Sequence, residues 1–210
     1  MKFILGFCMK VAVLLFVFIL FGSFVSAQKA DKSDRKVKGR VLTSKNAPEL
    51  RLKFGKNFKF TGSHEFVLYD RAKAEQFFFI EAANKKIKRL YMLQFENFLP
   101  NIDGKYQYNE PNSAEIGGLK YFSNTENVPN VEAALKAVPD SDIAKAAKFL
   151  QDKGFILMKS LKYQRFVRVL DNAKRSEFIM LYIEDSESSD SSEKNDDFQR
   201  RALANFKVLK

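Results

Sequence analysis

The strongest constraint on the fold comes from one short segment that is apolar on both sides. Successive side chains of a strand point to opposite faces, so residues 75–82 place Phe77 and Phe79 on one face and Phe78 and Ile80 on the other. Antiparallel sheets usually leave one face to water, so a strand of this kind must be covered on both sides. We therefore expect a central strand whose second face is covered by helices, by a long loop or by a bound ligand.

The neighbouring segments extend this strand into an antiparallel meander. Residues 50–60 alternate apolar and polar side chains, which is the period of a half-buried strand, and residues 64–69 are expected to form a second strand after a turn at Gly62 and Ser63. Asn84 and Lys85 form a plausible hairpin tip, from which residues 86–95 return with Ile87, Tyr91, Leu93 and Phe95 on one face.

Residues 100–130 interrupt this pattern. They are rich in Asn, Gly, Pro and Tyr, and a long irregular connection in a compact domain is often functional. Gly117 and Gly118 predict a turn, and a short edge strand around residues 119–122 is an alternative to a wholly irregular loop.

The C-terminal half begins with helical signals and continues with strands. Residues 131–138 predict a short helix, and Ser141 is placed to cap a main helix that ends at Lys153 before Gly154. Strands are then expected at 155–158, 163–170 and 176–183. The chain is thus expected to be an α+β protein, with an antiparallel sheet of about five to seven strands, one main covering helix and a short C-terminal helix.

The N-terminus has the parts of a secretory signal peptide in the expected order. Lys2 and Lys10 precede the apolar run 11–21, and small side chains follow at 25–27. We therefore predict a signal peptide at residues 1–27 and a periplasmic or secreted protein with no membrane span in its mature form. An uncleaved N-terminal membrane anchor is the alternative, because the apolar stretch is long.

The residues available after cleavage exclude several kinds of chemistry. The one cysteine, Cys8, precedes the apolar core of the signal, so a lipidated cysteine at the cleavage site is excluded, as are disulfides and a thiol nucleophile in the mature chain. With one histidine and no mature cysteine, a zinc site of familiar type is excluded. We expect neither a metal nor another cofactor.

Charge divides the mature chain into four parts. The formal net charge is +11, of which Lys2 and Lys10 leave with the signal, while residues 184–197 carry seven acidic side chains and one lysine. We predict a disordered basic segment at 28–40, a single α+β domain at 41–183, an acidic Ser-rich linker at 184–197 and a basic amphipathic helix at 198–210. A basic body could meet anionic lipid, polysaccharide, nucleic acid or an acidic protein.

Candidate catalytic residues are few. No nucleophile elbow, P-loop or dinucleotide fingerprint occurs, which leaves carboxylates and one histidine for acid–base work. Glu96 stands among large apolar residues, and we expect it to face outward, with burial among partners as the alternative. Glu81, opposite Lys88 in the predicted hairpin, and His64 complete the set.

The aromatic excess and the basic body favour a binding protein. We expect an exported, non-enzymatic binding or accessory protein of the cell envelope or exterior, whose ligand is an apolar small molecule or an anionic surface. The alternatives are a carboxylate-dependent, hydrolase-like enzyme and an envelope assembly subunit; nucleic acid is disfavoured for an exported chain, and the oligomeric state is left open. The expected ligand contacts are Phe77, Phe78, Phe79, Tyr91, Phe95 and Tyr121.

Overall fold

The computed structural model describes residues 34–109, 112–186 and 194–210. The predicted signal peptide, 1–27, lies outside the described residues, as does the first part of the basic segment 28–40. The described chain forms one structural unit. It is an α+β protein with antiparallel sheets, which confirms the predicted fold class.

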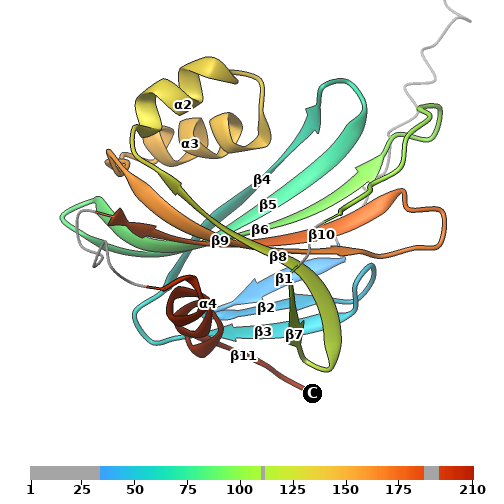
Figure 1. Cartoon of the computed structure of the whole chain (residues 1–210), viewed down its shortest axis with the longest axis horizontal. Coiled ribbons are helices and arrows are strands. Elements are labelled where there is room, and N and C mark those ends of the chain that lie inside the picture. Colours follow the sequence, from blue (N-terminus) through green and yellow to red (C-terminus); the bar gives the residue numbers. More distant parts are fainter. Residues whose placement is uncertain (1–33, 110–111, 187–193) are drawn as a thin grey trace, which may run out of the picture. The chain divides into compact units, whose positions relative to one another are not determined.

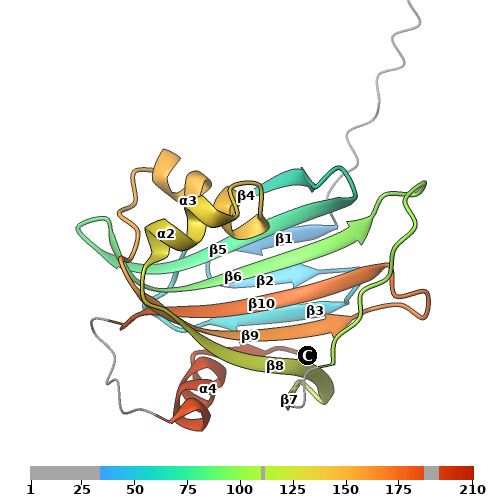
Figure 2. The ribbon, with the colours of Figure 1, turned by 45° about the horizontal axis from the view of Figure 1, so that its top comes forward.

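Two sheets and three helices make up the described residues. The larger sheet has seven strands, in the spatial order β4 (Lys59–Leu68), β5 (Ala72–Ala83), β6 (Lys86–Phe98), β10 (Ser176–Asp185), β9 (Leu161–Val169), β8 (Leu119–Val128) and β7 (Ser113–Ile116). The smaller sheet has four, in the order β1 (Arg35–Lys38), β2 (Val41–Ser44), β3 (Leu50–Phe54) and β11 (Phe206–Val208). The helices are α2 (Val131–Ala137), α3 (Asp142–Asp152) and α4 (Asn195–Ala204). Helices α2 and α3 lie on one face of the larger sheet, and the smaller sheet and α4 lie on the other (Figures 1 and 2).

Strand β5 is covered on both faces, as its sequence predicts. Phe77 and Phe79 belong to an apolar cluster shared with the four-stranded sheet and α4. Phe78 and Ile80 belong to a second cluster, which includes Leu150 of α3. All four side chains of β5 are at most 3% exposed, so the protein's own elements provide the cover.

The β5–β6 hairpin forms at the predicted tip. Asn84 and Lys85 both have positive φ, 50° and 65°, which is the backbone that a two-residue hairpin turn requires. The register differs by one residue from the simple prediction, because an irregularity follows Glu81 and places it opposite Arg89. The prediction that Glu81 pairs with Lys88 is therefore wrong.

Helix α3 has the predicted ends. The hydroxyl of Ser141 accepts a hydrogen bond from the backbone N–H of Ala144 at 3.1 Å, which satisfies an otherwise unpaired donor of the first turn. Gly154 follows the helix with φ of 77°, a conformation that favours glycine. The helix buries Ala146, Ala147 and Leu150.

The structure changes two predictions in the middle of the chain. Gly117 and Gly118 form the predicted turn, but the strand after it is longer than expected, because β8 continues to Val128 along β9. The strand expected at 155–158 is reduced to an isolated bridge between Ile156 and Lys86. That segment follows α3 directly and has only this contact with a strand backbone.

Both ends of the described chain form strands, where a disordered segment and a helix were predicted. Strand β1 lies within the basic segment expected to be disordered; the guanidinium of Arg35 sits 3.8 Å from the centre of the Phe95 ring and forms an ion pair with Glu75 at 2.9 Å. The C-terminal helix begins at Asn195, before the predicted start at residue 198, and ends at Ala204, after which Phe206–Val208 pair with β3 as β11. Strand β1 pairs with the next strand, β2, whereas β11 pairs with β3 far away in the sequence.

The start of the predicted acidic linker is part of the folded structure. Glu184 and Asp185 are the last residues of β10, and both are buried. Arg201 of α4 forms an ion pair with Glu184 at 2.9 Å, which accounts for the burial of this carboxylate. Residues 187–193 lie outside the described part of the chain.

Candidate functional site

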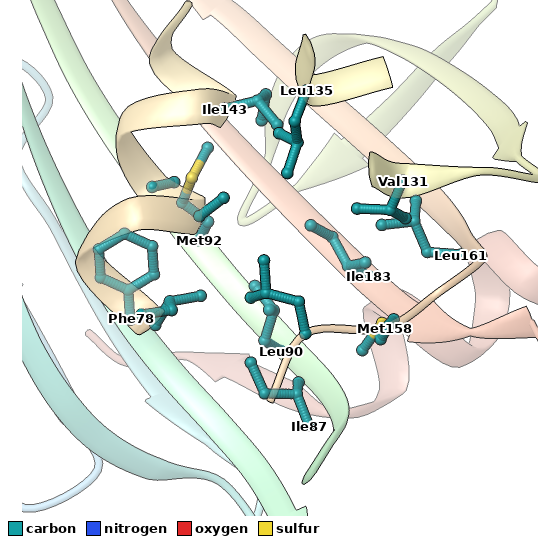
Figure 3. A pocket seen from close by; sticks show the side chains of 14 residues that line it. Phe78, Ile87, Leu90, Met92, Val131, Leu135, Ile143, Met158, Leu161 and Ile183 are labelled. Atoms are coloured by element: carbon teal, nitrogen blue, oxygen red, sulfur yellow. The ribbon is translucent and has the colours of Figure 1, made fainter. Parts of the chain in front are cut away.

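An apolar cavity lies between the two covering helices and the seven-stranded sheet. Its volume is about 70 Å³. All fourteen residues that line it are apolar: Phe78, Ile87, Leu90, Met92, Val131, Leu135, Ile143, Ala146, Ala147, Leu150, Leu157, Met158, Leu161 and Ile183. Side chains from both helices and from the strands point into this space (Figure 3). The cavity can therefore offer an occupant dispersion contacts but no hydrogen bond from a side chain.

The cavity is small for a ligand. An engineered apolar cavity of roughly 150 Å³ accepts benzene, and this one is about half as large. Ala146 and Ala147 of α3 face the sheet with the smallest possible apolar side chains, which leaves the space open. A larger occupant would require α2 and α3 to move away from the sheet.

Three large side chains hold these helices on the sheet: Val131 of α2, and Leu150 and the half-buried Phe149 of α3, whose ring stacks on that of Phe78 with the centres 4.9 Å apart. Val131 is the one buried residue of α2, and Leu150 is the one large buried residue of α3. Val138 and Ile143 are large apolar side chains of the same region that remain 50% and 38% exposed. A cover with so few buried anchors opens at a lower free energy than the sheet beneath it.

A row of hydrogen-bonded polar side chains crosses the same face of the sheet beside the N-terminus of α3. Nε2 of His64 lies 2.6 Å from Oε1 of Gln76, whose amide donates to Oε1 of Gln94 at 2.6 Å. Gln94 donates to Oε2 of Glu96 at 2.7 Å and to Oδ2 of Asp142 at 3.1 Å. Since both glutamines are fully buried, they connect a histidine on β4 to a carboxylate on β6 without intervening solvent.

The row ends in two opposed carboxylates. Glu96 and Glu177 are direct cross-strand partners on β6 and β10, and both are buried. Burial is the main reason that the pKa of Glu177 is raised to about 7; the Glu96 carboxylate also raises it, while Tyr108 and Arg165 act to lower it. Burial likewise raises the pKa of Glu96. Burial thus favours the neutral, protonated form of both carboxylates.

Two tyrosines from an irregular segment cover the carboxylates. Tyr106 donates its hydroxyl proton to Oε1 of Glu96 at 2.6 Å, and Tyr108 donates to Oε2 of Glu177. Arg175 holds the segment by donating to two of its backbone carbonyls, at 2.7 and 2.8 Å. Part of the long loop that the sequence marked as functional thus lies on the polar row.

The structure brings two of the three candidate catalytic residues into one network. Glu96 is buried, so the expectation that it faces outward is wrong, and the alternative of burial with partners holds. His64 is half-buried, stacks on Phe149 at 4.5 Å, and reaches Glu96 through the two glutamines. Glu81 is not part of this network; it accepts a hydrogen bond from Nε of Arg89 at 2.8 Å.

The six predicted ligand contacts lie on different sides of the sheet. Phe78 lines the apolar cavity. The other five belong to the cluster between the two sheets and are at most 4% exposed: Phe77, Phe79, Tyr91, Phe95 and Tyr121. The structure therefore does not gather the six residues around one space.

Most residues of the polar row were not predicted from the sequence. Gln76, Gln94 and Glu177 each have a buried apolar residue two positions away on the same strand, namely Phe78, Met92 and Ile179. A polar residue at such a position is the local signal that could have found them. Tyr106 and Tyr108 carry a weaker signal, since two aromatic residues with a spacing of two occur in many loops.

No protein-family model, curated protein or solved structure gives a match to this chain. Within residues 34–109, 112–186 and 194–210, no helix is long and apolar enough to cross a membrane. The same residues contain no group of three or more His, Cys, Asp and Glu side chains placed to hold a metal ion.

Proposed function

We propose that this protein is an exported binding or accessory protein that holds an apolar small molecule beneath α2 and α3. The wholly apolar lining of the cavity is the observation that carries the proposal. Ligand pockets are mostly lined by apolar side chains and are closed by elements that can move. The small side chains of α3 and the few buried anchors of the cover meet both requirements.

The free energies of binding and of opening the cover are comparable. Exposing Val131 and Leu150 would cost about 2 kcal/mol each, since burial of such a side chain is worth roughly that amount. Burying a chain of eight methylene groups gains about 6 kcal/mol at roughly 0.8 kcal/mol per group. A longer apolar chain therefore offsets more of the cost of moving the helices, whereas one of two or three carbons gains too little.

Mass spectrometry of the full-length gene product, purified from its native compartment, tests the proposal. Under native conditions we expect a mass excess from a small apolar molecule, and denaturation should release that molecule. Incubation with 1-dodecanol should produce a one-to-one adduct if the purified protein is empty. A protein that carries no small molecule and forms no adduct would contradict the proposal.

Filling the cavity should stabilise the protein. Ala146→Val adds two carbon atoms, or about 60 Å³ at the roughly 30 Å³ that one water occupies, and the cavity has about 70 Å³. We expect the free energy of unfolding to rise by about 1 kcal/mol, because two buried carbons outweigh the lower helix propensity of valine. Ala133→Val on the exposed side of α2 is the matched control and should lose about 0.5 kcal/mol. Urea denaturation of the two variants compares them directly.

A second candidate function is acid–base catalysis by Glu96 and Glu177. It is favoured by the opposed, buried carboxylates and by the raised pKa of Glu177. Neither carboxylate lines the apolar cavity, which is why binding is our first proposal. A screen with ester and glycoside substrates tests this function: Glu96→Gln and Glu177→Gln should each abolish any hydrolysis found, while circular dichroism shows an intact fold.

A further inference from the structure

A second hollow lies at the edge of the seven-stranded sheet, beside the tip of the β5–β6 hairpin. It has a volume of about 530 Å³, within the range of small-molecule sites. Nine residues line it: Asn57, Lys59, Phe60, Thr61, Ile80, Ala82, Lys85, Lys153 and Phe155. Three lysines are its only ionisable side chains, so it is a cationic groove with aromatic and aliphatic walls.

The lysines of this groove are available to an anion. In the described part of the chain, no ion pair involves Lys59, Lys85 or Lys153, and all three side chains belong to exposed residues. Two of them lie over aromatic rings instead: the ammonium of Lys85 is 4.8 Å from the centre of the Phe155 ring, and that of Lys153 is 5.0 Å from the centre of the Phe149 ring. An anionic group in the groove would gain charge-assisted contacts without first breaking an ion pair.

Backbone hydrogen bonds hold the two sides of the groove together. The N–H of Ile156 donates to the carbonyl of Lys85 at 2.9 Å, and the N–H of Ile87 donates to the carbonyl of Ile156 at 3.2 Å. The segment that follows α3 is thereby tied to the hairpin tip. The positions of Lys85 and Phe155 are thus fixed before any ligand arrives, which reduces the entropy lost on binding.

The groove adjoins the apolar cluster that contains the cavity. Ile80 lines the groove, is 3% exposed, and belongs to the same cluster as the cavity residues Phe78 and Ile87. Phe155 lines the groove and packs against that cluster as well. The lysines therefore stand beside the apolar space, at the end of α3 where the cover meets the hairpin tip.

We infer that the ligand is a single-chain anionic amphiphile, an alkyl carboxylate, whose head binds the lysines of the groove while its chain enters the cavity beneath α2 and α3. The inference rests on the proposed function and adds the chemistry of the head group. The absence of acidic side chains among the nine lining residues gives charge complementarity, and the groove and the cavity border the same apolar cluster, which the chain of the ligand would enter. A free anion without an apolar chain would gain only the charge complementarity.

Binding of a matched pair of ligands to the full chain tests this inference. Dodecanoate and 1-dodecanol have the same chain and differ in charge, and each is titrated by displacement of an uncharged apolar fluorophore at low salt. The variant Lys85→Gln/Lys153→Gln removes two groove lysines. The control Lys120→Gln/Lys207→Gln removes the same charge from exposed strand positions elsewhere. Acetate, inorganic phosphate and vesicles of anionic phospholipid complete the set.

We expect dodecanoate to bind about tenfold more tightly than dodecanol, and the groove variant to lose this preference while it keeps dodecanol binding. The control variant should retain the preference. If the two ligands bind equally and the groove variant changes nothing, the inference fails and the proposed function stands. If neither ligand binds, the proposed function fails as well. If acetate or phosphate bound as tightly as dodecanoate, the inference that the ligand is an amphiphile would be wrong. Binding to vesicles alone would contradict it too.

Discussion

Phe54→Ala should lower the free energy of unfolding by about 4 kcal/mol, since truncation of a fully buried phenylalanine removes its transfer free energy and leaves a cavity. Phe54 is 1% exposed and stacks on Phe79 with the ring centres 4.0 Å apart. It also contacts Tyr91 and Phe206, at 5.0 and 6.3 Å between ring centres. One side chain of β3 thus connects both sheets and the C-terminal strand.

Phe60→Ala provides the control for this substitution. Phe60 is 37% exposed, so the same truncation should reduce the free energy of unfolding by about 1 kcal/mol. Guanidinium denaturation followed by circular dichroism measures both. Equal, small losses for the two variants would show that the smaller sheet does not pack against β5 as described.

The contribution of Glu177 to the unfolding free energy should also fall by about 3 kcal/mol between pH 4.5 and pH 7. The ordinary pKa of a glutamate is 4.5, and burial raises the pKa of Glu177 to about 7 in the folded protein. Between these values the folded state binds more protons than the unfolded chain, so stability decreases as the pH rises. The full contribution is present below pH 4.5 and has been lost above pH 7, and the size follows from 1.36 kcal/mol per pH unit.

Glu177→Gln should remove most of this pH dependence, because a glutamine has no proton to lose and its amide also relieves the repulsion on Glu96. The pKa of Asp171 is lowered, so its own titration affects stability only below this window. Urea denaturation at pH 4.5, 5.5, 6.5 and 7.5 gives the comparison with the wild-type protein. Parallel curves for the two proteins would contradict the raised pKa of Glu177.

Local sequence patterns predicted the central part of the fold. The apolar residues on both faces of β5 required two covers, and the structure supplies both from the chain itself. The hairpin tip and the cap of α3 were predictable because each depends on residues a few positions apart. These features need no information about distant partners.

The four-stranded sheet could not be predicted in the same way. Strand β1 has three basic residues and one valine, which is also typical of a disordered segment. Strand β11 pairs with β3, about 150 residues earlier in the chain, and no local sequence pattern predicts such a distant partner. Glu96 was a candidate catalytic residue because of its neighbours in the sequence. Its position opposite Glu177 depends on the pairing of β6 with β10, which is a long-range contact.

Titration with an uncharged apolar fluorophore tests most directly whether an apolar molecule occupies the space beneath α2 and α3. The wild-type protein and Ala133→Val should bind the probe at one site with the same affinity. Ala146→Val, which fills the cavity, should bind at least tenfold more weakly. Equal affinity of all three proteins would place the probe elsewhere and contradict the account.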